Sequence, residues 1–136
     1  MNYYFIIAAF FLFLLLPVHT IRGTKAINKL NPLQLTPSHQ ELYRCFLLAN
    51  SGVQMITIDL LLTAVFLLLT GIGVIPYNFY LVLFIALIYI GYTISWLVPM
   101  MLKKVPRFCY FHLPQWILFI IVFILIVIGT WQTEIV

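Results

Sequence analysis

Charged residues are scarce in this chain, and acidic residues are almost missing from it. Only 7% of its 136 residues are charged, with three Asp or Glu against seven Lys or Arg. Soluble domains average about 25% charged residues, so this chain cannot cover a water-facing surface. Hydrophobic residues make up 65% of it, which is typical of a membrane-embedded protein. The basic residues flank apolar runs, which favours a role in membrane orientation over nucleic-acid binding.

Cysteine is also sparse, because the chain holds only Cys45 and Cys109. Two cysteines do not make a disulfide framework, and we expect both to be reduced thiols on the cytoplasmic side. Cys109 and His112 have the spacing of half a zinc site. His39 and Cys45 lack a standard spacing that would complete it. We therefore predict no metal site and no cofactor.

The first apolar run lacks the features of a signal peptide. No Lys or Arg precedes Arg22, and residues 17–20 do not form a small-residue cleavage site. We interpret the run as a retained helix that is inserted with its N-terminus outside. Pro17 is expected to end or kink this helix near the inner surface.

Four apolar runs are long enough to cross a bilayer. We predict spans at about residues 3–21, 46–72, 79–102 and 115–131, with a cytoplasmic loop at about residues 22–40. Gly71, Gly73 and Pro76 are expected to end the second span. The predicted fold is all-α, a single polytopic domain of four transmembrane helices in an antiparallel bundle.

The basic residues predict the orientation of this bundle. All seven follow the first or the third span: Arg22, Lys25, Lys29, Arg44, Lys103, Lys104 and Arg107. The positive-inside rule then places them in the cytoplasm and both termini outside. Lys103, Lys104 and Arg107 also lie beside aromatic residues and are candidates for binding an anionic lipid. The clear charge bias and small size favour a bacterial inner membrane.

Polar side chains inside the membrane concentrate on the second and third spans. The second span carries Asn50, Gln54 and Thr57 on one face and Gly52, Asp59, Thr63 and Thr70 on the opposite face. The third span carries a stripe of Tyr89, Tyr92, Thr93 and Trp96. Membrane helices pack through small and hydrogen-bonding residues. We therefore expect the second and third helices at the centre, with the first and fourth facing lipid.

Asp59 is the leading candidate for a functional residue. It is the only ionisable side chain that we place inside a span, where a charge costs about 2.5–3.5 kcal/mol. Tyr89, Tyr92 and Thr93 are expected at the same depth, and we predict a hydrogen bond from one of them to Asp59. Two interpretations stay open: a protonated Asp59 that links helices, or a proton- or cation-linked site.

A second candidate site lies at the cytoplasmic boundary, where Arg44, Asn50 and Gln54 could bind a ligand. The layout of the chain resembles the MAPEG family of membrane-bound glutathione-linked enzymes, which bind glutathione through an Arg, an Asn and a Glu at this helix start. The resemblance implies such a role for Arg44 and Asn50. It covers the layout only, because Val53 replaces the Glu, and Tyr89 and Tyr92 replace the Arg and His usual in the third helix.

Three functional hypotheses follow from these features. The leading one is a non-enzymatic accessory or structural subunit of a membrane assembly, or a homo-oligomer, in contact with lipids and other membrane proteins. The second is a MAPEG-like binder or enzyme for a lipophilic ligand at the cytoplasmic boundary. The third is a small transporter or channel component that uses Asp59. Co-purification of a partner, ligand loss in Asn50→Ala, and flux loss in Asp59→Asn would distinguish them.

Overall fold

Four helices account for most of the part that the computed structural model describes, residues 1–29, 40–102 and 115–135. The helices are α1 (Tyr3–Asn28), α2 (Gln40–Gly71), α3 (Phe79–Leu102) and α5 (Gln115–Ile135). Each contains a stretch that is long and apolar enough to cross a membrane. The structure is therefore all-helical, as predicted, and its four candidate spans indicate an integral membrane protein.

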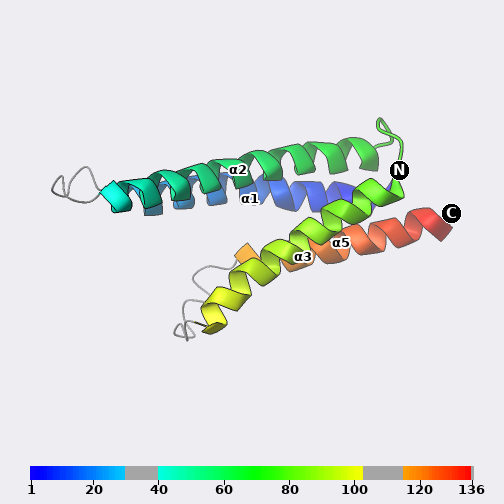
Figure 1. Ribbon diagram of the computed structural model, residues 1–136. Helices are drawn as coiled ribbons and strands as arrows, with labels where there is room; N and C mark the ends of the chain where they lie inside the picture. Colours follow the sequence, from blue (N-terminus) through cyan, green and yellow to red (C-terminus); the bar gives the residue numbers. More distant parts are fainter. Residues whose placement is uncertain (30–39, 103–114, 136) are drawn as a thin grey trace.

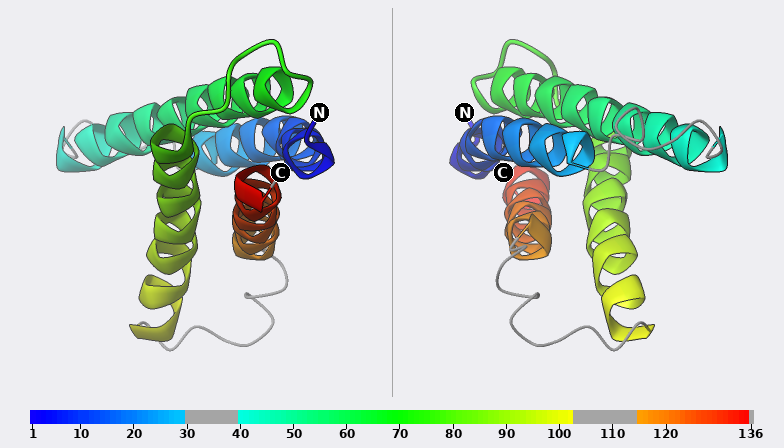
Figure 2. Two further views of the ribbon diagram at one scale, coloured as in Figure 1. Left: turned by 90° about the vertical axis from the view of Figure 1, so that its right-hand side faces the viewer. Right: turned by 90° about the vertical axis from the view of Figure 1, so that its left-hand side faces the viewer.

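The helices form two pairs that meet at one end of the molecule. α1 packs along α2, and α3 packs along α5 (Figure 1). α1 also packs against α5, whereas α2 and α3 scarcely touch each other over the described residues. Both termini and the connection between α2 and α3 lie at the same end, and the pairs diverge away from it (Figures 1 and 2). We call these the termini end and the open end.

The expected order of packing is wrong, because α1 rather than the α2–α3 pair is central. Ala8 and Ala9 of α1 are fully buried. A Cβ atom added at Gly71 would lie 2.8 Å from Ile6, and one added at Gly129 would lie 2.6 Å from the Phe5 ring. Small residues therefore let α2 and α5 approach α1 closely, and this fit outweighs the polar stripes in choosing neighbours.

The core runs along α1 and continues between α3 and α5. Its large side chains are almost completely enclosed, and they include Phe5, Leu12, Leu15, Leu60, Leu67, Tyr89, Phe119 and Ile126. They recur at the three- and four-residue spacing of one helix face. This core thus joins the two helix pairs through α1.

α1 does not end near residue 21 as expected but continues through Pro17 to Asn28. Proline removes one backbone hydrogen bond, and helices in a packed membrane protein tolerate this loss. Residues 22–28, expected in a loop, are therefore helical, and His19 lies inside the span. Ser38 and Glu41 have the spacing of a capping box, which predicts that the second helix starts near residues 36–38. Residues 36–38 lie outside the described part of the chain.

The end of α2 follows the prediction from its glycines. Gly73 has a φ of 85°, which favours glycine at this position. Its N–H donates to the Thr70 carbonyl at 3.1 Å, and the Val74 N–H donates to the Leu69 carbonyl at 2.9 Å. This is the Schellman pattern that stops a helix. Asn78 then caps α3 by accepting from the Leu81 N–H at 3.1 Å.

Candidate functional site

The predicted hydrogen bond to Asp59 is confirmed. The Tyr92 hydroxyl of α3 donates to Asp59 Oδ2 of α2 at a distance of 3.2 Å. Both side chains are half-buried. Because α2 and α3 scarcely touch elsewhere in the described ranges, this bond spans the open gap between the two helix pairs.

Tyr89 and Thr93 support this pair without binding Asp59. The Thr93 hydroxyl donates to the Tyr89 carbonyl of its own helix at 3.0 Å. The buried Tyr89 ring meets the Tyr92 ring edge-on, with centroids 5.9 Å apart, and also contacts Phe119 at 6.0 Å. Its hydroxyl lies near Thr63 and Asp59 but completes no hydrogen bond with a described residue. The site is therefore one polar pair backed by aromatic rings.

His19 also lies in this region, and its position there was not predicted from the sequence. The hydroxyls of Thr20 and Thr57 lie 3.3 Å apart, so His19 of α1 lies nearly level with this part of α2. Asp59 is only about 3 Å further along its helix. The interpretation of Asp59 as the only ionisable side chain inside a span is therefore wrong. Extending the first span beyond residue 21 would have placed His19 well inside the membrane instead of near its boundary.

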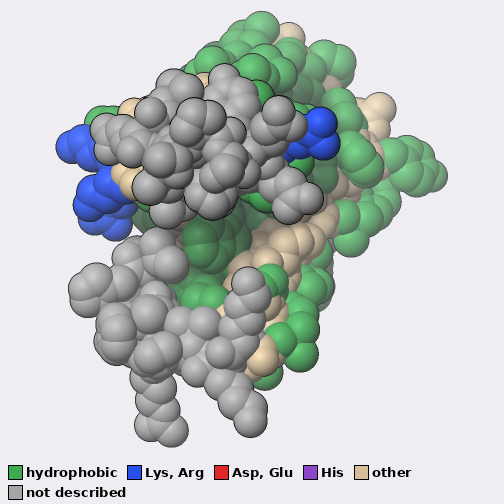
Figure 3. All heavy atoms as spheres, turned by 60° about the vertical axis from the view of Figure 1, so that its left-hand side comes forward, with side chains coloured by type: hydrophobic (Ala, Val, Ile, Leu, Met, Phe, Trp, Pro, Cys, Tyr) green, Lys and Arg blue, Asp and Glu red, His purple; other side chains and the backbone are tan. Residues whose placement is uncertain are grey.

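The candidate site at the cytoplasmic boundary is more open. Arg44 and Gln54 are exposed, and Asn50 is half-buried. None of the three forms a hydrogen bond or ion pair with another described residue. Figure 3 shows Lys and Arg side chains in two separate groups on this face of the molecule, with hydrophobic side chains beyond them. Lys103, Lys104, Arg107, Cys109 and His112 lie outside the described residues, as does His39.

Asn2 forms a polar link at the termini end that the sequence analysis did not single out. Its Oδ1 caps α1 by accepting from the backbone N–H groups of Tyr4 at 3.1 Å and Phe5 at 3.3 Å. Its Nδ2 donates to the Gly129 carbonyl at 2.7 Å and to Thr133 Oγ1 at 2.8 Å.

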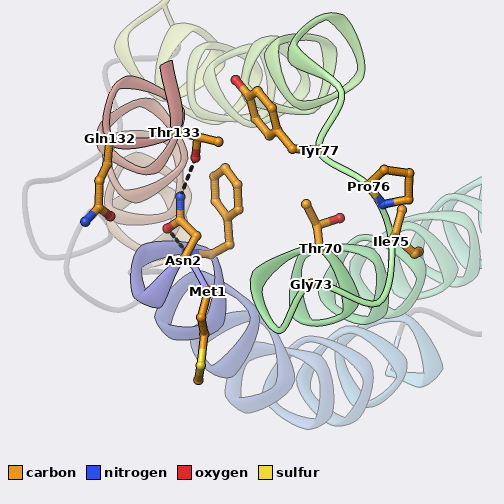
Figure 4. Close-up of a pocket in the computed structure, with 10 residues that line it drawn as sticks. Met1, Asn2, Thr70, Gly73, Ile75, Pro76, Tyr77, Gln132 and Thr133 are labelled. Atoms are coloured by element: carbon orange, nitrogen blue, oxygen red, sulfur yellow. Dashed lines mark hydrogen bonds between the residues drawn. The ribbon is translucent and has the colours of Figure 1, made fainter. Parts of the chain in front are cut away.

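The Asn2 backbone N–H also donates to the carbonyl of Gly71 at 2.8 Å. One residue thereby connects α1, α2 and α5 (Figure 4). The signal available in the sequence was an asparagine directly before an apolar run, which is a helix-capping pattern.

A cavity of about 430 Å³ opens beside Asn2. Figure 4 shows Thr70, Tyr77 and Thr133 around it. The Tyr77 ring stacks on Phe5, with centroids 6.2 Å apart, and its hydroxyl donates to Glu134 Oε1 at 3.4 Å. Burial, and then the negative charge of Glu134, raise the pKa of Tyr77. The polar side chains around the cavity can form hydrogen bonds. Most of the bonds that they form join one part of the helix bundle to another.

Within the described ranges, no three His, Cys, Asp or Glu side chains gather in a way that could hold a metal ion. The polar groups that the structure brings together are therefore the Asp59 carboxyl and Tyr92 phenol, the nearby buried imidazole of His19, and the link from Asn2 to α5. No family model, no curated protein and no solved structure matches this chain.

Proposed function

We propose that the protein is a non-enzymatic interaction subunit of a membrane assembly, which binds a transmembrane helix of another subunit along α2. In this proposal the four helices form an antiparallel bundle with both termini outside and the basic residues in the cytoplasm. The positive-inside rule supports this orientation.

The proposal rests on the burial and hydrogen bonding of Asp59. A carboxyl group this deep in a membrane is expensive, at about 2.5–3.5 kcal/mol when charged. The side chain is only half-buried, and its one hydrogen bond to a described residue is the 3.2 Å bond from Tyr92. A carboxyl group has room for further donors. A hydrogen-bond donor on a partner helix would bury the exposed part of the Asp59 side chain and occupy its remaining acceptor sites.

The face of α2 beside Asp59 supports the same conclusion. α2 packs against α1, and Ser51 and Gln54 of α2 remain exposed. Met55 lies between them and Asp59 around the helix, and it is 71% exposed. A polar serine and an amide among apolar residues are the groups that link helices in a membrane. The surface of α2 formed by Ser51, Gln54 and Met55 is therefore better suited to contact another helix than to contact lipid alone.

Site-specific photo-cross-linking tests the proposal in the native membrane. A photoreactive phenylalanine analogue at Met55 is expected to give one discrete protein adduct, which mass spectrometry would identify as a second copy or a different subunit. The matched control is the same analogue at Leu87 on α3, which is 57% exposed and lies on another helix. It is expected to label lipid.

Asp59→Leu provides the second arm of this experiment. It removes the carboxyl group while keeping an apolar side chain, so the adduct at position 55 should weaken severalfold. Asp59→Asn, which can still accept a bond from Tyr92, should retain most of it. The proposal fails if position 55 labels only lipid, or if Asp59→Leu leaves the adduct unchanged.

A further inference from the structure

A cleft of about 370 Å³ lies between the two helix pairs, next to the Asp59–Tyr92 bond. All four helices contribute to its walls, so the cleft lies between the two pairs, whose divergence is visible in Figure 2. The residues that matter here are His19, Ile56, Tyr92, Ser95, Trp96 and Phe119. Because these walls belong to membrane helices, an occupant would enter from the bilayer.

His19 is the unusual member of this lining. Its side chain is only 6% exposed, and neither ring nitrogen has a hydrogen-bond partner among the described residues. The Val53 carbonyl lies near the ring without completing a hydrogen bond to it, and it accepts from the Thr57 hydroxyl at 2.8 Å. Buried polar groups in folded proteins are nearly always paired. A ligand in the cleft would supply the missing partner.

The remaining walls define what such a ligand looks like. Tyr92 and Phe119 have ring centroids 5.5 Å apart at an angle of 48°, and Trp96 and Ile56 add further apolar surface. Aromatic walls favour a flat ring, which can stack on them or meet their edges. Apolar pockets with a few polar groups are typical of small-molecule sites. The polar groups at hand are the His19 imidazole and the Ser95 hydroxyl.

We infer that this cleft binds a lipophilic molecule with a flat, carbonyl-bearing ring, of the quinone class. A neutral imidazole has one N–H donor, and His19 donates it to a ring carbonyl. The aromatic side chains hold the ring, and the hydrocarbon tail extends toward the open end. This inference concerns the gap between the pairs and does not depend on a partner along α2.

Trp96 is a built-in reporter for the test. Trp116 and Trp131 are replaced by Phe, and the full-length protein is placed in phosphatidylcholine nanodiscs. Titration with decyl-benzoquinone is expected to quench Trp96 fluorescence in a saturable way. A matched protein that keeps only Trp131, which is 69% exposed and distant from the cleft, should show only the linear quenching of quinone dissolved in lipid.

His19→Leu should weaken the saturable binding by at least about tenfold, the loss expected for a buried hydrogen bond. His19→Gln keeps an N–H donor and should bind more tightly than His19→Leu. Replacing an unpaired polar group by an apolar one is nearly neutral for stability, and circular dichroism would verify the fold. Equal binding in His19→Leu, or displacement by decyl acetate as effective as by the quinone itself, would overturn the inference.

Discussion

At the scale of single residues, glycine decides how closely the helices pack. Gly129 and Gly91 both lie inside helices, but they have opposite surroundings. A Cβ atom at Gly129 would meet the Phe5 ring at 2.6 Å and Asn2 Oδ1 at 3.2 Å, whereas one at Gly91 would meet no described atom within 4 Å. Phe5 is 1% exposed and its ring stacks on Tyr77, so a shift of the ring would disturb that contact.

Gly129→Ala should therefore destabilise the protein, by about 1–3 kcal/mol for an overpacked site. Gly91→Ala should stabilise it by up to about 1 kcal/mol, because alanine favours the helix. Both are measured by unfolding in mixed micelles of dodecyl maltoside and SDS, followed by circular dichroism. Equal effects of the two substitutions would show that α5 does not approach α1 closely at Gly129.

Tyr77 makes the termini end sensitive to alkaline pH. Burial and the Glu134 carboxylate raise the pKa of Tyr77 in the folded protein above its value in the unfolded chain. Its neutral phenol therefore contributes stability that is complete below roughly pH 10 and is lost as the pH rises through the folded value. Phenolate absorbance in wild type minus Tyr77→Phe should titrate above the ordinary tyrosine range.

Glu134→Gln is the matched control for this titration. Removing the carboxylate should move the pKa of Tyr77 down toward its ordinary value without removing the effect of burial. A Tyr77 that titrates at or below the ordinary value in the folded protein would contradict the arrangement of Tyr77, Phe5 and Glu134.

At the scale of helices, α1 depends on the residue that precedes it. Asn2→Ala removes the N-cap, which costs about 0.5–2 kcal/mol, and also the side-chain bonds to α5 at Gly129 and Thr133. We expect a loss near the upper end of that range in micelle unfolding. Asn28→Ala, an exposed asparagine at the other end of the helix, should have little effect. Similar losses at both positions would argue against the link.

The helices themselves could be predicted from the sequence, but their neighbours could not. Apolar length and the glycine cap at Gly73 identify the helices because both are local properties. Packing order depends on where small residues meet, and Gly71 and Gly129 lie at helix ends where the polar stripes gave no signal. The depth of His19 was not predicted, because the first span was expected to end near residue 21 and α1 continues to Asn28. The partner of Asp59 could be narrowed to Tyr89, Tyr92 or Thr93 by depth, and the structure shows that it is Tyr92.

At the scale of the whole molecule, the positions of the termini make the proposed orientation testable. Cys45 is exposed on α2 toward the basic end. In a Cys109→Ser background, a membrane-impermeant maleimide should label Cys45 only after the cells are permeabilised. A cysteine at Gln132, which is exposed near the opposite end, should react in intact cells when both natural cysteines are replaced. The reverse pattern would overturn the orientation.

The Asn2 link also has a consequence for biosynthesis. The bonds from Asn2 reach Gly129 and Thr133, which are 127 and 131 positions later in the chain. The ribosome must therefore add the 127 residues that separate Asn2 from Gly129 before the first of these bonds can form, while α1 and α2 are free to pair as soon as both have entered the membrane. Asn2 stays unbonded to α5 during this time, and the arrival of α5 in the membrane completes the link.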